Sequence, residues 1–179
     1  MSDTQVYYIH GFRSTAESET LQLLRKEFPD AIGLDYDHND PSGSILAMVI
    51  RINSDGKFPT IVGSSLGGWY TEQLTKRIVG DFIMYNPSTQ PEVALARYGL
   101  SQEVLYKYKT QSSSSNRYSP MSSRTVVLCS DDEVVDPTLA DVKYRGNAAM
   151  LYTNGGHRMT IDNMKIITDR IKYLENQLP

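Results

Sequence analysis

The residues Gly63-Ser64-Ser65-Leu66-Gly67 follow the spacing glycine, any residue, serine, any residue, glycine. This spacing is typical of a nucleophile elbow, in which a serine stands on a sharp turn between a strand and a helix and its hydroxyl attacks an acyl carbon. Glycines on both sides of the serine lack the Cβ that would collide in so tight a turn. Ser65 is therefore the candidate nucleophile. Ser64 would need glycines at the positions of Val62 and Leu66, so we interpret it as a small residue of the turn.

A serine hydroxyl is a weak nucleophile unless a base takes its proton, and that base needs an orienting carboxylate. The sequence holds three histidines. His157 follows two glycines and lies between the last predicted strand and the last predicted helix, so it is the candidate base. His10 ends the first predicted strand, and we expect its ring to support the loop that follows. His38 lies in a polar turn and is interpreted as a solvated loop residue.

The candidate acids lie in one short loop, which follows the predicted strand 125–129. It contains four carboxylates, at Asp131, Asp132, Glu133 and Asp136. Asp136 precedes a proline, which is typical of a helix N-cap. Glu133 is long and is interpreted as solvated. Because successive residues of an extended chain point in opposite directions, local physics leaves Asp131 and Asp132 both open as the acid.

The loop after the first predicted strand, His10-Gly11-Phe12-Arg13, resembles the His-Gly motif whose following backbone donates to an oxyanion hole. Gly11 lets the chain pass close to a substrate. The N–H of Phe12 would then join the N–H of Leu66, and two such donors stabilise the negative charge of the transition state. Arg13 is a candidate substrate-binding residue for an anionic group. Its alternative role is that of a solvated surface arginine.

Short apolar segments alternate with helical segments along the chain and must position these residues. Strands are expected at 6–10, 31–36, from 60 into the elbow, 81–85, 125–129 and 148–152. Helices are expected at 14–28, 44–52, 66–79 and 160–177, with one more between the last two strands. Ser14 or Thr15 would cap the first helix. The alternation predicts a compact three-layer α/β fold with a mostly parallel sheet of about six strands.

Residues 88–124 interrupt this alternation. Short helices are expected at 91–98 and 101–108, and a polar run follows at 111–116. We interpret 88–124 as a small insertion in a single domain that covers residues 1–179. It is either a mobile surface loop or a small lid over the serine.

The composition excludes several classes of protein. Of the 179 residues, 40% are hydrophobic and 22% are charged, which is ordinary for a soluble globular protein. The net charge of −3 argues against nucleic acid or an anionic membrane as a partner. No apolar run reaches the roughly 20 residues that cross a bilayer. The polar N-terminus predicts no signal peptide, and the single Cys129 permits no internal disulfide. We therefore expect a cytoplasmic protein.

Five segments occur in the order typical of one known group: 8–12 (YIHGF), 63–70 (GSSLGGWY), 85–87 (YNP), 132–136 (DEVVD) and 155–157 (GGH). Together they resemble the small YqiA-type bacterial esterases of the α/β-hydrolase superfamily. The resemblance implies an α/β-hydrolase fold without a large lid domain, and activity on esters or thioesters of short to medium acyl chains. It also implies that the first aspartate of 132–136 orients the histidine, which favours Asp132 over Asp131.

The resulting hypothesis is a serine esterase with the triad Ser65, His157 and Asp132 and an acyl-enzyme intermediate. Phe12 and Leu66 would form the oxyanion hole, and Gly11 and Arg13 would contact a small-molecule ester or thioester. We expect no cofactor, because the protein supplies the nucleophile, and no metal site, because no residue cluster has ligand spacing. The alternatives are a non-catalytic binding or scaffold protein on a hydrolase fold, and an acyltransferase. The oligomeric state is left open.

Overall fold

The computed structural model describes residues 4–113 and 118–178. In these residues six parallel strands form one sheet in the order β2-β1-β3-β4-β5-β6. The strands are β1 (Thr4–Ile9), β2 (Ile32–Leu34), β3 (Phe58–Ser64), β4 (Asp81–Tyr85), β5 (Ser123–Cys129) and β6 (Ala149–Thr153). The chain reverses direction across the sheet at β1, which has β2 on one side and β3 on the other. Ligands of open parallel sheets bind beyond the carboxyl ends of the strands at such a point.

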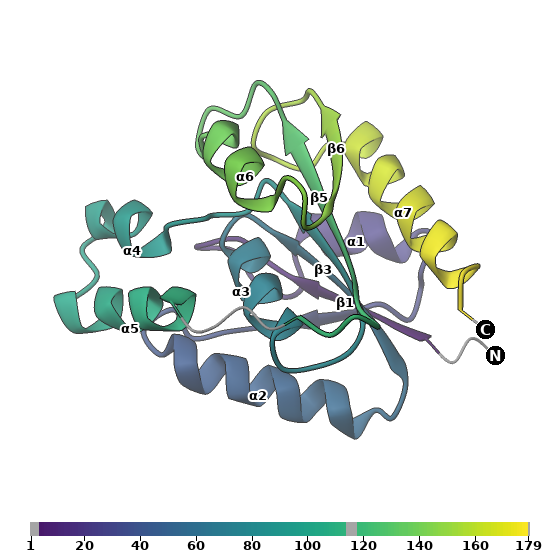
Figure 1. Cartoon of the computed structure of the whole chain (residues 1–179), viewed down its shortest axis with the longest axis horizontal. Helices are drawn as coiled ribbons and strands as arrows, with labels where there is room; N and C mark the ends of the chain where they lie inside the picture. The colour runs from purple at the N-terminus through teal and green to yellow at the C-terminus, as the bar shows by residue number, and fades with distance from the viewer. Residues whose placement is uncertain (1–3, 114–117, 179) are drawn as a thin grey trace.

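Helices cover both faces of the sheet (Figure 1). They are α1 (Glu19–Arg25), α2 (Pro41–Ser54), α3 (Leu66–Thr75), α4 (Pro91–Ala94), the 3₁₀ helix η1 (Ala96–Tyr98), α5 (Gln102–Ser113), α6 (Pro137–Tyr144) and α7 (Ile161–Glu175). Successive strand residues point to opposite faces. Val6 and Tyr8 of β1 therefore pack with α1 and α7, whereas Tyr7 and Ile9 pack with α2, α3 and α5. The predicted three-layer α/β fold with its mostly parallel sheet is confirmed.

The first helix begins later than predicted. Ser18, rather than Ser14 or Thr15, is its N-cap and accepts a hydrogen bond from the Leu21 N–H. The preceding residues form a loop that is bonded elsewhere, because the Ala16 N–H donates to the Asp35 carboxylate at 2.8 Å. This loop, rather than a helix, follows the predicted oxyanion residues. In contrast, α2 begins earlier than predicted, at Pro41.

The predicted insertion 88–124 contains α4, η1 and α5, and its residues 114–117 lie outside the described part of the chain. The end of the predicted polar run falls on those residues. Helix α5 packs on the body of the domain, where the Tyr108 hydroxyl lies 3.1 Å from that of Tyr70 and donates to the His38 carbonyl at 3.0 Å. The Trp69 indole donates to Ser112 at 2.9 Å. Whether the segment opens as a lid stays a prediction.

None of the helices in the described ranges has both the length and the apolar character that crossing a bilayer requires.

Candidate active site

Ser65 stands at the junction between β3 and α3. Its backbone has φ 55° and ψ −118°, a strained conformation for a residue with a side chain. Its N–H donates to the Tyr85 carbonyl of β4 at 3.0 Å, which fixes the turn against the next strand. Its hydroxyl caps no N–H of α3 and is therefore available for another partner. Strain of this kind is concentrated at functional sites in proteins.

The two glycines of the elbow are required by close packing. A Cβ at Gly63 would lie 2.1 Å from the Thr71 hydroxyl and 2.3 Å from the Gly67 carbonyl oxygen. A Cβ at Gly67 would lie 2.1 Å from the Ile9 carbonyl oxygen at the end of β1. The motif therefore lets α3 start directly against two strands, and any side chain at either glycine would push the helix away from the sheet.

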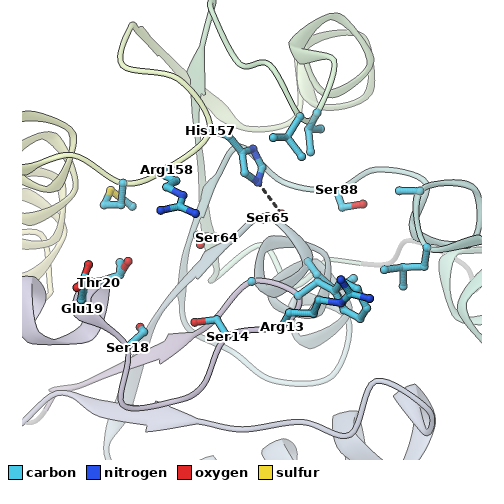
Figure 2. A pocket seen from close by; sticks show the side chains of 18 of the residues that line it. Arg13, Ser14, Ser18, Glu19, Thr20, Ser64, Ser65, Ser88, His157 and Arg158 are labelled. Carbon is cyan, nitrogen blue, oxygen red and sulfur yellow. Dashed lines mark hydrogen bonds between the residues drawn. The ribbon is translucent and has the colours of Figure 1, made fainter. Parts of the chain in front are cut away.

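The structure brings Ser65, His157 and Asp132 together. The Nε2 of His157 lies 2.9 Å from the Ser65 Oγ, as the dashed line in Figure 2 marks. Its Nδ1 lies 2.8 and 3.0 Å from the two carboxylate oxygens of Asp132. The Asp132 side chain is only 1% exposed and that of His157 15%. The three groups thus form one hydrogen-bonded chain that opens to solvent at the serine.

Asp132 is held as a carboxylate. Burial by itself would raise the pKa of this carboxyl, but hydrogen bonds from His157 and from the backbone N–H groups of Val134 and Val135 outweigh burial and lower the pKa. An ionised carboxylate only accepts hydrogen bonds, so the proton of a neutral His157 must lie on Nδ1. The Nε2 is then free to accept the serine proton, as general base catalysis requires.

The neighbours of Asp132 hold the backbone around His157. The Asp131 carboxylate accepts hydrogen bonds from the N–H groups of Gly155 at 3.0 Å and Gly156 at 3.1 Å, and these bonds lower its pKa. The Glu133 carboxylate accepts from the His157 N–H at 3.0 Å. Glu133 is exposed, as predicted, but it also has this structural role. Asp136 is the N-cap of α6, as predicted.

Asn86, Tyr85 and Cys129 form a buried polar cluster that contacts the His157 loop. The sequence alone assigned no role to this cluster. The Asn86 side chain donates to the Gly156 carbonyl at 3.1 Å and accepts from the Cys129 N–H at 2.8 Å. The Tyr85 hydroxyl lies 3.2 Å from the Arg158 carbonyl and 3.0 Å from the buried Cys129 sulfur. Asn86 also has a positive φ of 43°. The available signal was the polar Asn-Pro pair directly after a buried strand.

The loop after β1 lies against the elbow. A Cβ at Gly11 would be 3.4 Å from the Ser65 Cβ, so the chain passes close to the nucleophile here. The His10 ring is buried, lies 2.8 Å from the Gly11 carbonyl oxygen and stacks on Tyr36 at 4.4 Å. In the described part of the chain, the Phe12 N–H has no backbone acceptor. Leu66 is the first residue of α3, so its N–H has no acceptor within the helix.

Two other predicted residues lie beside this loop. His38 is half-buried rather than solvated, because its ring lies edge-on to the Phe12 ring with centroids 5.3 Å apart. Arg13 is exposed and has a positive φ of 60°, and its guanidinium lies 4.9 Å from the centre of the Tyr98 ring. Tyr98 belongs to η1, so the insertion contributes to the surroundings of the predicted oxyanion loop.

A cavity of about 680 Å³ opens over Ser65 and His157. It is lined by residues of the loop after β1, the elbow, the insertion and the His157 loop, which include Gly11, Phe12, Arg13, Leu66, Tyr98 and Arg158 (Figure 2). All four predicted oxyanion and substrate-binding residues therefore border one space, since Gly11, Phe12, Arg13 and Leu66 line it together with His157. Among the described residues, no group of three or more His, Cys, Asp or Glu side chains is arranged to hold a metal ion.

Comparison with known proteins gives a family and a fold. The model of a family described as "Uncharacterised protein family (UPF0227)" matches residues 5–174. A UPF0227 protein of Vibrio parahaemolyticus is 25% identical over 140 residues, which cover 74% of this chain and 78% of that protein. One from Vibrio vulnificus is 25% identical over 138 residues, which cover 73% and 77% of the two chains.

Solved structures share the architecture at low sequence identity. Alpha/beta hydrolase domain-containing protein 10 from mouse is 16% identical with a TM-score of 0.75, over 98% of this chain and 90% of that one. Est1E from Butyrivibrio proteoclasticus is 13% identical with a TM-score of 0.74, over 98% and 89%. The Pyrococcus furiosus esterase Pf2001 is 15% identical with a TM-score of 0.70, over 96% and 83%. These similarities show an α/β-hydrolase fold.

Proposed function

This chain belongs to the UPF0227 family, and on that premise we propose that it is a serine esterase that hydrolyses carboxylic esters or thioesters of short to medium acyl chains. The observation that carries the proposal is the hydrogen-bonded chain from the Ser65 Oγ through the His157 ring to the Asp132 carboxylate. The names of two structural neighbours, an esterase and Est1E, agree with this reaction class.

In the proposed first half-reaction the Ser65 Oγ bonds to the acyl carbon while its proton passes to the His157 Nε2. The carbonyl oxygen becomes an oxyanion, which the N–H groups of Phe12 and Leu66 would stabilise. The carbon–oxygen or carbon–sulfur bond to the leaving group then breaks, and the leaving group takes the proton from His157. This step leaves an acyl-enzyme on Ser65.

In the second half-reaction a water molecule gives a proton to His157 and bonds to the acyl carbon. The bond to the Ser65 Oγ breaks, the proton returns to Ser65, and the carboxylic acid departs. Asp132 holds the ring in place and stabilises its positive charge in both halves. The proposed mechanism uses no cofactor. A cytoplasmic location and a small-molecule ester as the partner stay predictions.

The test is Ser65→Ala, assayed with p-nitrophenyl butyrate and with a fluorophosphonate probe that labels activated serines. We expect loss of labelling and a fall of at least about 10³-fold in kcat, because the remaining groups supply no nucleophile. Ser64→Ala is the matched control, since the Ser64 hydroxyl lies 3.2 Å from that of Tyr8 and bonds to neither His157 nor Asp132. Absence of labelling in the wild-type protein would favour the scaffold alternative.

A further inference from the structure

The cavity over Ser65 has an unusual balance of charge. Arginines at positions 13, 97 and 158 line it, whereas Glu19 is the one carboxylate among its described lining residues. The chain as a whole has a net charge of −3, so this local excess of positive charge opposes the overall charge. Charges of one sign that line a cleft raise the local concentration of ligands of the opposite sign.

The three arginines also lack carboxylate partners. In residues 4–113 and 118–178, no ion pair joins Arg13, Arg97 or Arg158 to an acid. Other arginines of the same chain do pair with acids, namely Arg25, Arg51 and Arg145. Two acids that contact the same loop, Asp131 and Glu133, are occupied, because they accept hydrogen bonds from the backbone of residues 155–157. The guanidinium groups at the cavity are thus available to an external anion.

Two of the three guanidinium groups lie close to the same aromatic ring, that of Tyr98. The Arg13 guanidinium lies 4.9 Å from the centre of the Tyr98 ring, and that of Arg97 lies 5.0 Å from the same centre. Contacts of this kind hold an arginine through the ring face and leave its N–H groups free. Two like charges near one ring repel each other, and a bound anion would reduce that repulsion. Figure 2 shows Arg158 on the other side of the opening from Arg13.

The backbone of Arg13 is strained. Its φ of 60° is in the left-handed region, in a turn closed by a hydrogen bond from the Ser14 N–H to the Gly11 carbonyl at 3.2 Å. Glycine or asparagine would adopt that backbone at lower cost. The strained residue is an arginine, it directly follows Phe12, and its side chain lies at the mouth of the cavity. Because strained residues are concentrated at active sites and ligand-binding sites, Arg13 is a candidate for substrate contact.

We propose that the substrates of this site are esters that carry an anionic group, and that Arg13 and Arg97 bind that group while Arg158 adds to the positive potential. The inference rests on the proposed esterase function and specifies its substrate class. The anion is a carboxylate in the simplest case, on the acyl part or on the leaving group. An arginine binds a carboxylate through two parallel N–H···O bonds, which a neutral chain end does not provide.

The experiment compares charged and neutral esters of matched shape. For the acyl side the pair is mono-p-nitrophenyl adipate and p-nitrophenyl hexanoate. For the leaving group the pair is 3-acetoxybenzoate and 3-acetoxybenzamide. We expect kcat/KM, corrected for spontaneous hydrolysis, to be at least about tenfold higher for the charged member of one pair. The preference should shrink in 1 M salt, where the Debye length is about 3 Å.

Substitution of the arginines tests whether they cause the preference for charged esters. Arg97→Gln and Arg13→Gln should each lower the charged-to-neutral ratio of kcat/KM by about tenfold. Arg145→Gln is the matched control, because Arg145 pairs with Asp141 on α6 and does not line the cavity. A ratio near one in the wild-type protein for both pairs, or a ratio unchanged in both cavity variants, would overturn the inference while leaving the esterase proposal intact.

A binding measurement makes the inference independent of turnover. Calorimetric titration of Ser65→Ala with adipate should show binding that is lost in the Ser65→Ala, Arg97→Gln double variant. If no ester is hydrolysed but adipate binds in this Arg97-dependent way, the anion site stands and the esterase proposal fails. If adipate does not bind and the charged esters are not preferred, the anion site is rejected.

Discussion

The Asp132 carboxylate and the His157 ring, 25 residues apart in the chain, meet with both carboxylate oxygens within 3.0 Å of the Nδ1. Asp131, the neighbouring residue, does not contact the ring and instead binds the N–H groups of two glycines in the same loop. Two adjacent aspartates therefore hold one histidine in different ways, one through its ring and the other through the backbone that precedes it.

The different contacts predict different losses of activity. Asp132→Asn should lower kcat for p-nitrophenyl butyrate by about 10³- to 10⁴-fold, because an amide no longer holds the ring in the required tautomer. Asp131→Asn is the matched control and should cost less than about tenfold, since its remaining carbonyl oxygen still accepts from a glycine N–H. If Asp131→Asn proves to be the more damaging change, the choice of acid is wrong.

The acid side of the pH profile should report a single proton. Hydrogen bonds keep the Asp132 pKa below that of an ordinary carboxyl, so this group stays ionised as the pH falls from 7 to about 5. The mechanism requires an unprotonated Nε2 to accept the serine proton, and with Asp132 ionised throughout this range, one proton at most separates the active from the inactive triad. We expect log kcat/KM for a neutral ester to fall with a limiting slope of one as the pH decreases. A flat profile, or a slope of two, would contradict this assignment.

The elbow glycine nearest to β1 should be essential for stability. Gly67→Ala places a Cβ 2.1 Å from the Ile9 carbonyl oxygen, far inside van der Waals contact, so α3 must move away from the sheet. We expect the free energy of unfolding in urea to fall by about 3 kcal/mol. Gly56→Ala is the control: Gly56 has a positive φ of 63°, but no atom lies within 4 Å of its added Cβ, so the substitution should cost about 1 kcal/mol. Equal losses in the two variants would show that the packing at Gly67 is not tight.

The parts of the fold that could be predicted are those that depend on local pattern. The elbow, its strand and its helix follow from a few adjacent residues, and the alternation of apolar and helical segments predicted the parallel sheet that the structure confirms. The start of α1 could not be predicted, because Ser14, Thr15 and Ser18 are all good caps. The hydrogen bond from Ala16 to Asp35, a residue distant in sequence, favours a loop before Ser18.

The candidate site, like the fold, was predicted where local sequence decides and not where contacts between distant residues decide. Local reasoning left Asp131 and Asp132 open, and only resemblance to a family favoured Asp132. The structure adds the reason, which is the path of the 155–157 loop beside the residues that follow β5: the loop presents two backbone N–H groups to Asp131 and a ring to Asp132. The partners of Glu133 and Asn86 could not be predicted, because these partners are backbone atoms of a loop that is distant in sequence.

The strands that carry Ser65 and His157 are not equally well supported by the sheet. Ser65 follows β3, which is paired on both sides by β1 and β4, whereas His157 follows β6, which pairs with β5 alone at the margin of the sheet. Ala149 and Tyr152 of β6 are exposed, so this strand is less securely packed than the interior ones. Local opening of proteins begins at such weakly packed parts. Fraying of this one margin would separate base from nucleophile while the remaining layers stay folded, so inactivation can precede denaturation.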